Sequence, residues 1–289
     1  MLTLNNDRMN AFYQVAIDKN FNKAAMNLCI TQPALSQRIQ KLEQELQATL
    51  LVRNNTCIEL TNMGQRLFDY ARNNIALEQG LLTDFSGNKN ETFGSLRIAA
   101  YSSILRSVIM PSIEPLVRKY PLIHVEFYSR EIRELIPMLK SGEADLIILN
   151  HLDDDAKLVN ELLGEETLVH IRPNSGINKE TDYENTIFLD HDTEDTTTYD
   201  FFNQQELGHV VLKRRFYDDV YGIIDGVSLG LGDAIASKHL VKNYPNVQQI
   251  EHKYDVNEPV YLYWIQNIHH SPIQREAIDC LMKNVKGYL

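Results

Sequence analysis

The first sixty residues alternate short stretches of helical periodicity with brief breaks. Apolar positions recur at helical spacing within Arg8–Asp18, and a second short helix is expected at Lys23–Leu28, with Asn22 accepting a backbone N–H of its first turn. Thr31 can cap a third helix, in which Pro33 stands in the first turn, where a missing N–H costs nothing. Three short helices are therefore predicted at the start of the chain.

The third predicted helix has two contrasting faces. Its apolar stripe, which can pack on the first two helices, is Leu35, Ile39, Leu42 and Leu46. Its opposite face is polar, rich in amides and barely charged: Gln32, Ser36, Gln37, Gln40, Lys41 and Gln44. Gln and Ser can hydrogen bond to base edges while Lys holds phosphates, so this face suits the DNA major groove. If the pattern of this helix is considered by itself, a solvent-exposed face of a plain helical hairpin is the more common explanation.

Two short apolar segments follow the third helix. Leu50–Arg53 and Cys57–Leu60 are separated by the turn formers Asn54–Thr56, which predicts a small β-hairpin. We interpret this hairpin as a wing, with Arg53 at its root within reach of a phosphate or the minor groove. A lone surface arginine is, however, also a common solubilising charge.

A single long helix is predicted from Asn62 to Phe85, because the segment is periodic and contains no proline. One apolar stripe is heptad-like with Asn74 as a polar layer: Met63, Leu67, Tyr70, Leu77 and Leu81. The second stripe is Phe68, Ala71, Ile75, Leu82 and Phe85. Two stripes imply a partner chain, although burial inside one larger domain fits the pattern equally well. The turn formers Ser86–Asn90 end this segment.

Strands and helices alternate beyond this boundary. Strands are expected at Ser95–Tyr101, Ile123–Tyr128 and Ala144–Leu149, with helices at Leu105–Lys119 and Ile132–Ser141 between them. The alternation indicates a mainly parallel sheet, in which ligands bind beyond the carboxyl ends of strands. A second α/β lobe is expected from the strand-like segments Glu166–Ile171, Thr186–Asp190, Val210–Phe216 and Pro259–Ile265, before a terminal helix at Pro272–Val285.

The charge of the chain is unevenly distributed. The 289 residues carry a net charge of −11, which as an average argues against nucleic-acid binding. Residues 1–90, however, hold nine Lys/Arg against eight Asp/Glu, so the acidity belongs to the remainder. A near-neutral module joined to an acidic one is compatible with a DNA-binding unit attached to a separate sensor.

Other features bear on the compartment in which the protein works. The three cysteines are far apart and without C-x-x-C spacing, which argues against disulfides or a zinc ribbon. Neither a signal-peptide pattern nor an apolar stretch of about 20 residues is evident. We therefore expect a cytoplasmic protein with no membrane partner.

No motif predicts a metal, a cofactor or catalysis. His269–His270 is the one close histidine pair and has no carboxylate at matching spacing. Gly226, Gly230 and Gly232 form neither a dinucleotide fingerprint nor a P-loop. Asp153–Asp155 lacks the remaining ligands of a calcium loop, and no nucleophile elbow is present. We therefore predict no catalytic residues, no metal-binding residues and no cofactor, and we do not expect the chain to be an enzyme.

Many N-terminal positions coincide with one family pattern. They are Phe12, Ala24, Ala25, Leu28, the run from Thr31 to Ser36, Ile39, Leu42, Glu43, Leu50, Arg53, Leu60, Thr61 and Gly64. In type and spacing they resemble the DNA-binding module of the LysR-type transcriptional regulator family. Gln47 and Leu51 stand where glycine and phenylalanine are usual, and Asn22 replaces Ser or Thr. These departures affect local turns more than the polar face.

The rest of the chain resembles the same family less closely. The segments Gly94–Ile98, Leu139–Leu146 and Gly226–Ala234 are similar to its opening strand, its helix-to-strand turn and a turn of its second lobe. The resemblance implies an α+β protein: an N-terminal winged helix-turn-helix, a long linker helix and a two-lobed α/β domain of periplasmic-binding-protein type. The expected divisions are residues 1–61, 62–90 and 91–289, with lobe I at 91–162 and 268–289 and lobe II at 163–267.

The resemblance also implies a function and its residues. It indicates a homodimeric or homotetrameric transcriptional regulator that binds a promoter site on double-stranded DNA and responds to a small-molecule effector, a carboxylate or amino acid. The implied DNA-binding residues are Thr31, Gln32, Pro33, Ser36, Gln37, Lys41 and Arg53. The implied effector-binding residues are Ser102, Ser103, Ser129 and Asn150, at strand ends near helix N-termini. The alternatives are a cytoplasmic small-molecule-binding protein or an α/β enzyme, either without DNA function.

Overall fold

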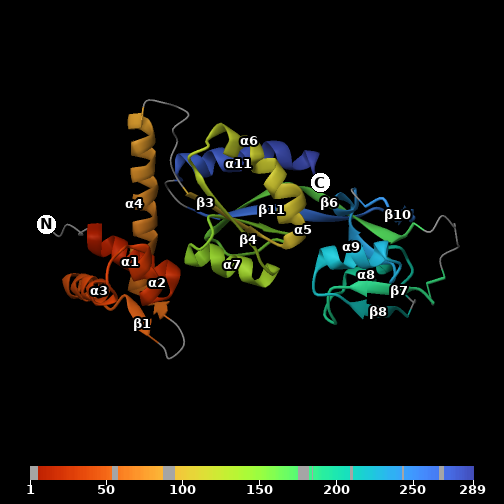
Figure 1. Cartoon of the computed structure of the whole chain (residues 1–289), viewed down its shortest axis with the longest axis horizontal. Helices are drawn as coiled ribbons and strands as arrows, with labels where there is room; N and C mark the ends of the chain where they lie inside the picture. The colour runs from red at the N-terminus through yellow and green to blue at the C-terminus, as the bar shows by residue number, and fades with distance from the viewer. Residues whose placement is uncertain are drawn as a thin grey trace.

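The chain folds into an N-terminal head, a long helix and a two-lobed domain, arranged in that order along the molecule (Figure 1). The structure is a computed structural model that describes residues 6–53, 58–86, 95–174, 182–183, 185–208, 211–242, 244–266 and 270–289. Within these residues the predicted fold class is confirmed. None of the helices in this described part is long and apolar enough to cross a membrane.

Three helices form the head. They are α1 (Asn6–Asp18), α2 (Phe21–Asn27) and α3 (Gln32–Leu46). Thr31 caps α3 as predicted, because its hydroxyl accepts the Ala34 N–H at 3.4 Å. The predicted cap of α2 is wrong: Asn20, not Asn22, accepts the N–H groups of residues 22 and 23, so the helix starts two residues earlier.

The head encloses its own apolar core. Phe12, Leu35 and Leu42 are completely buried, together with Phe68 from the long helix. Three of the four residues in the predicted apolar stripe of α3 lie in this core, which turns the amide-rich face outward. Gln47 ends α3 with φ of 50°, a left-handed conformation that explains why glycine is usual at this position in the family.

The predicted wing is present as a two-stranded hairpin. Strand β1 (Leu51–Arg53) pairs antiparallel with β2 (Ile58–Leu60), and the turn between them lies outside the described residues. The Glu43 carboxylate ties the hairpin to α3 by accepting the N–H of Leu50 at 2.7 Å. Gly64 is required next to it, since a Cβ there would lie 2.1 Å from the carbonyl oxygen of Leu50.

The long helix α4 (Asn62–Ser86) carries two apolar stripes, as predicted. At the start of one stripe Phe68 and Ala71 are buried, with Phe68 in the core of the head. On the other, Leu67 is buried in the core of the head, whereas Met63, Tyr70 and Leu81 are about half exposed at 49%, 51% and 56%. The side chains of Leu77, Leu82 and Phe85 lie outside the described residues.

Lobe I is a parallel sheet covered by helices on both faces. Its strands are β3 (Ser95–Ala100), β4 (His124–Ser129) and β5 (Leu146–Leu149), with β3 in the middle. A continuous helical stretch follows β3: α5 (Ser102–Ile104), the π-helix η1 (Leu105–Ile109) and α6 (Met110–Lys119). Helices α6 and α11 (Pro272–Asn284, followed by η2, Val285–Gly287) pack together over one face, and α7 (Ile132–Ser141) packs on β5.

Two long antiparallel strands join the lobes. Strand β6 (Leu158–Pro173) pairs with β11 (Val256–Ile265), and β11 also pairs with β5. The sheet order is β10-β6-β11-β5-β3-β4, with β9 also on β6. The sheet is therefore mixed: β3, β4 and β5 of lobe I are parallel, as expected, and the pairings of β6 and β11 are antiparallel. The chain leaves lobe I along β6 and returns along β11, so these two strands run in opposite directions and pair antiparallel.

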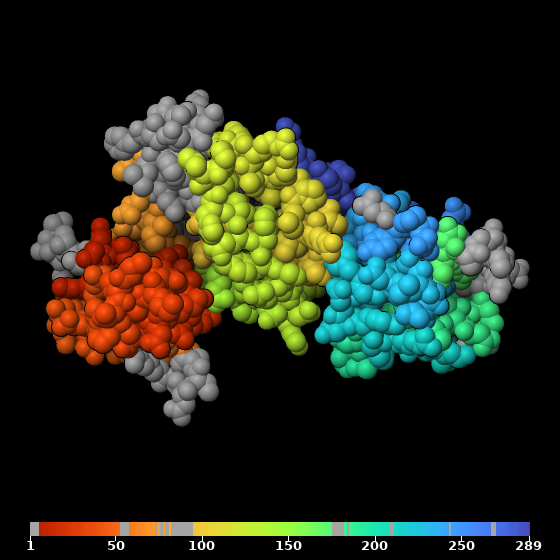
Figure 2. Space-filling view, in the orientation of Figure 1, coloured from red at the N-terminus to blue at the C-terminus, as the bar shows by residue number. Residues whose placement is uncertain are grey.

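Lobe II contains short elements around the far half of β6. Strands β7 (Ile187–Asp190) and β8 (Lys213–Phe216) form a separate parallel pair. The remaining elements are β9 (Ala234–Ser237), β10 (Val247–Ile250), α8 (Thr197–Gln204), α9 (Val220–Ser228) and α10 (Lys238–Val241). Figure 2 shows the head, lobe I and lobe II as three successive bodies, with the lobes meeting along a seam.

Candidate nucleic-acid interface and effector site

The polar face of α3 lies on the surface of the head. Thr31, Pro33, Gln37 and Lys41 are exposed. Gln32 and Ser36 are half-buried, and the Gln32 amide donates to the Ser36 hydroxyl at 3.0 Å. That bond keeps the two side chains together one helical turn apart, at the border between the buried stripe and the exposed face. The face offers both donors and acceptors to solvent, as recognition of base edges requires.

Two more glutamines extend this face. Gln40 and Gln44 are exposed on α3 beside the predicted residues, so the amide-rich surface runs along most of the helix. Their position on this face was predicted, but they were not among the predicted DNA-binding residues. Arg53 ends β1 at the root of the wing, and its side chain lies outside the described residues.

The four predicted effector residues gather at one edge of the lobe I sheet. Ser102 begins the helical stretch after β3, and Ser103 beside it is buried. Ser129 is exposed at the end of β4, in register with the end of β3. Asn150 follows β5, which is parallel to β3. All four positions are therefore at or beyond the carboxyl ends of neighbouring parallel strands.

A buried polar network next to these positions connects the two lobes. The Glu166 carboxylate on β6, only 3% exposed, accepts the Tyr101 hydroxyl at 2.9 Å and lies 2.9 Å from Nε2 of His239. Nδ1 of His239 in turn lies 2.8 Å from the Ser107 hydroxyl in lobe I. Burial, and then the nearby Glu166 carboxylate, raises the pKa of Tyr101. The network joins β3 and η1 of lobe I to β6 and α10.

A second carboxylate lies beside this network and is less well partnered. Glu258 on β11 is the register partner of Glu166 on β6, so the two side chains lie on the same face of the sheet. The Asn150 amide donates to Glu258 at a distance of 3.4 Å. Burial, followed by the charge of Glu166, raises the pKa of Glu258. A ligand at this edge therefore meets hydroxyls, an amide and a half-buried carboxylate.

Sequence reasoning did not identify Tyr101, Glu166, His239 or Glu258. Glu166 gave no distinct signal in the sequence, because it directly follows Glu165 in a stretch that also contains Glu161. Its partners lie 65 and 73 residues away in the sequence, so no local pattern connects them. Among the described residues, no group of His, Cys, Asp and Glu has a geometry that could hold a metal ion.

Two family descriptions match the chain along nearly its whole length. Residues 7–65 match the bacterial regulatory helix-turn-helix protein of the lysR family. Residues 89–286 match the LysR substrate binding domain. The first match covers the head and the start of α4, and the second covers both lobes.

Curated relatives are transcriptional regulators. A putative transcriptional regulator of Pseudomonas aeruginosa is 35% identical over 127 residues, covering 44% of this chain. With that protein and two further curated relatives the alignment spans 42%, 47% and 49% of the relative's own length. The HTH-type transcriptional regulator HdfR of Yersinia enterocolitica is 24% identical, and the alignment covers 97% of each chain.

A solved structure has the same fold. ArgP from Mycobacterium tuberculosis superimposes with a TM-score of 0.75 at 17% identity, covering 99% of this chain and 98% of ArgP. At this identity the likeness concerns the arrangement of head, long helix and two lobes.

Proposed function

The chain belongs to the LysR family of bacterial helix-turn-helix regulators, and from this premise we propose that it binds promoter DNA and that a small effector controls this binding. Family members are transcriptional regulators, so the alternatives without DNA function are set aside. The observation that carries the proposal is the outward-facing, amide-rich side of α3. The proposed division is head 1–61, linker 62–90 and effector-binding domain 91–289.

The proposed DNA contacts follow from the chemistry of each side chain. Gln32, Ser36 and Gln37 would read base edges in the major groove. Lys41 and Arg53 would hold phosphates. Thr31 and Pro33, at the N-terminus of α3, would lie next to the sugar-phosphate backbone of the DNA. The near-neutral charge of the head is sufficient, because a dimer doubles the number of phosphate contacts.

We propose a homodimer whose α4 helices pair. Leu67 of the predicted stripe packs into the head, but Met63, Tyr70 and Leu81 on either side of it stay about half exposed and supply the apolar surface that helix pairing requires. A two-fold dimer places two α3 helices in successive major grooves of a pseudo-palindromic site. A tetramer would pair two such dimers through the effector-binding domains.

The effector proposed here is an amino acid rather than a simple carboxylate. Ser102, Ser129 and Asn150 supply groups that hydrogen bond to a carboxylate at the edge of lobe I. Glu258 supplies a negative charge for an ammonium group at the same edge. A plain dicarboxylate would instead meet Glu258 and Glu166 as like charges, which disfavours it.

The DNA part is tested by gel shift on the promoter region beside the gene for this chain. Gln32→Ala and Ser36→Ala should each lose about 1–3 kcal/mol of binding free energy, because each removes base-edge hydrogen bonds. Gln249→Ala, an exposed glutamine of β10, serves as the control and should bind as the parent does. Circular dichroism checks that the fold is retained. Parent-like binding by both α3 variants would contradict the assignment of the reading face.

The effector part is tested by thermal unfolding with arginine, lysine, serine, acetate and succinate as probes. An amino acid should raise the melting temperature by about 5 °C at saturation, since it binds only the folded chain. Glu258→Gln should lose this shift, whereas Glu161→Gln, an exposed residue of the same β6–β11 ribbon, should keep it. A shift with succinate alone, retained in Glu258→Gln, would contradict the amino-acid proposal.

A further inference from the structure

The head touches lobe I of its own chain through an aromatic contact. Gly142 ends α7 with φ of 72°, and a Cβ there would lie 2.6 Å from Cζ of Phe68 on α4. Phe68 is fully buried, and the ring of Tyr13 from α1 stacks on it with centroids 5.1 Å apart and an interplanar angle of 15°. Elements of the head, the linker helix and lobe I therefore meet at one point without space for a larger residue at 142.

Charged groups surround this aromatic contact. Nζ of Lys19, just after α1, lies 2.8 Å from Oε1 of Glu143, the residue after Gly142. Arg97 at the start of lobe I donates to Asp145 at 2.9 Å, and its positive charge acts on the Tyr13 hydroxyl of the head. Both sides of the joint thus supply complementary groups within a few residues of one turn.

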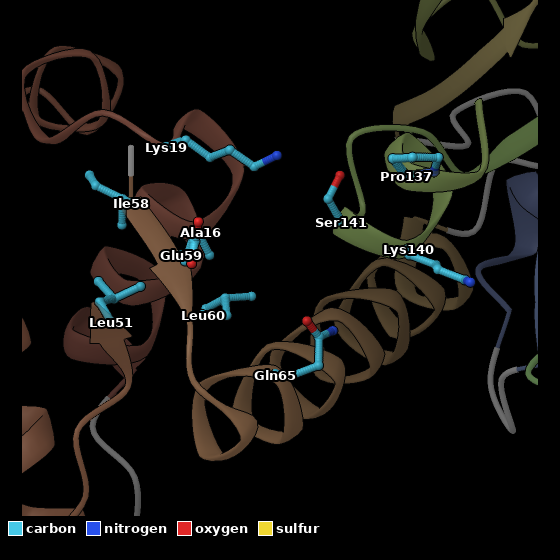
Figure 3. A pocket seen from close by; sticks show the side chains of 10 residues that line it. All are labelled: Ala16, Lys19, Leu51, Ile58, Glu59, Leu60, Gln65, Pro137, Lys140 and Ser141. Carbon is cyan, nitrogen blue, oxygen red and sulfur yellow. The ribbon is translucent and has the colours of Figure 1, made fainter. Parts of the chain in front are cut away.

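The joint is limited to one side of the head. Beside it, a cavity of about 380 Å³ separates the wing from α7 (Figure 3). Leu51, Ile58 and Leu60 line this cavity on the side of the head, and Pro137 and Ser141 of α7 line it on the side of lobe I. The wing is therefore not packed against lobe I, and the attachment is made by α1 and the first half of α4.

We propose that this set of residues, Tyr13, Lys19, Phe68, Arg97, Gly142, Glu143 and Asp145, is a latch that fastens each head to lobe I of the same chain. We name it the head–sensor latch. It holds the head at one angle to lobe I, so the head and lobe I move as one body. A change in the angle between the lobes is then a rotation of lobe II relative to that body. Lobe I of the effector-binding domain is then coupled to the DNA-binding head by a direct contact as well as through the linker helix α4.

The latch leaves the DNA-binding side free. The residues of α3 that face solvent belong to the side opposite its buried stripe, whereas the latch uses α1, α4 and the turn after α7. The latch can therefore stay closed while the head is on DNA. Aromatic stacking and close packing at Gly142 supply the holding contact, and the Lys19–Glu143 pair, which is partly exposed, fixes the orientation.

A carbodiimide cross-link tests the latch directly. The reagent joins a lysine amine to a nearby carboxylate as an amide and takes up the water that is released. Full-length protein made as a mixture of ¹⁴N and ¹⁵N copies, assembled together, should yield a Lys19–Glu143 linked peptide in which both halves carry the same isotope. Lys119–Glu276, a pair 3.0 Å apart within lobe I and of similar exposure, is the internal standard.

Two variants make the test decisive. Lys19→Arg keeps the charge but removes the amine, so it should abolish this link alone. Gly142→Ala places a methyl group against Phe68 and should lower the Lys19–Glu143 yield severalfold while the Lys119–Glu276 yield stays constant. The latch is overturned if the standard forms without the Lys19–Glu143 link, if that link is found equally in mixed-isotope peptides, or if Gly142→Ala leaves its yield unchanged.

Discussion

Two histidines of lobe II illustrate how single side chains respond to the interior of the protein. His170 is fully buried, with Nε2 at 2.9 Å from the Asp233 carboxylate and Nδ1 at 3.0 Å from Nε2 of His252. Burial lowers the pKa of His170, against the opposing effect of Asp233. Burial, then the neighbouring His170 and Arg172, lowers the pKa of His252 to about 4. Both imidazoles are therefore neutral in the folded protein at pH 7.

This pair predicts a specific pH dependence of stability. An unfolded histidine takes up a proton near pH 6.5, whereas folded His252 does so near pH 4, so the unfolded chain binds more protons between these values. The free energy of unfolding should therefore fall as the pH is lowered from about 7 towards 4, and the contribution of this pair should be constant above 7. Urea unfolding of the parent and His252→Gln at pH 7.5 and 5 checks this. The variant should lose less stability between the two pH values, and an equal loss would refute the prediction.

Single residues were the least predictable scale of the site. The polar residues of α3 could be placed because they repeat every three or four positions along one helix, so the periodicity itself separates outside from inside. Glu166 and Glu258 could not be placed, because their pairing depends on the register of two strands that are far apart in sequence. Asn20 was displaced by Asn22 in the prediction, since two asparagines two residues apart are equally good caps.

At the scale of elements, the wing is attached to α4 by a close approach of backbones. The Cβ of an alanine at position 64 would lie 2.1 Å from the carbonyl oxygen of Leu50, a distance that no side chain can relieve. Gly64→Ala should therefore destabilise the head by about 2 kcal/mol or more, and it should weaken DNA binding through the displaced wing. Gly287→Ala, where no atom lies within 4 Å of the added carbon, is the control. Chemical unfolding measures the difference, and parent-like stability of the Gly64 variant would be inconsistent with this packing.

Elements were predicted best where a single face decides their pattern. The periodicity of α3 and α4 gave their bounds within about one residue, because apolar residues recur at helical spacing along the whole of each helix. Strand β6 extends from Leu158 to Pro173, well beyond the predicted Glu166–Ile171, since its exposed residues near the hinge hide the strand pattern. Strands β9 and β10 have four residues each, too few to show a period, and their pairing with β6 defines them.

At the scale of the whole molecule, the proposed pairing of α4 helices makes a dimer of two chains the DNA-binding unit. Leu81→Glu places a charge in the apolar stripe and should convert the dimer to monomers, because an unpaired charge in a helix seam is costly. Leu152→Glu is the matched control, since Leu152 in lobe I is equally exposed at 58% against 56%. Sedimentation velocity measures the change. Dimers of Leu81→Glu as stable as those of Leu152→Glu would exclude α4 as the main pairing helix.

The sequence gives the order of the parts, and the structure adds how they touch. The near-neutral head and the acidic remainder could be separated from charge alone. Phe68, on which Tyr13 stacks, contacts Gly142, which lies more than seventy residues further along the chain, so this meeting point depends on the packed positions of three elements. No local pattern encodes such a meeting point, and it emerges only when the head and lobe I are both folded.

The central claim is that the exposed amide face of α3 reads the base sequence, and one comparison tests it most directly. The dissociation constants of the parent and of Gln37→Ala are measured at one fixed salt concentration, on the promoter duplex and on a scrambled duplex of equal length. The account predicts that affinity for the promoter falls by about tenfold while affinity for the scrambled duplex stays the same, because only base-specific bonds are lost. An equal loss on both duplexes, or none on either, would contradict it.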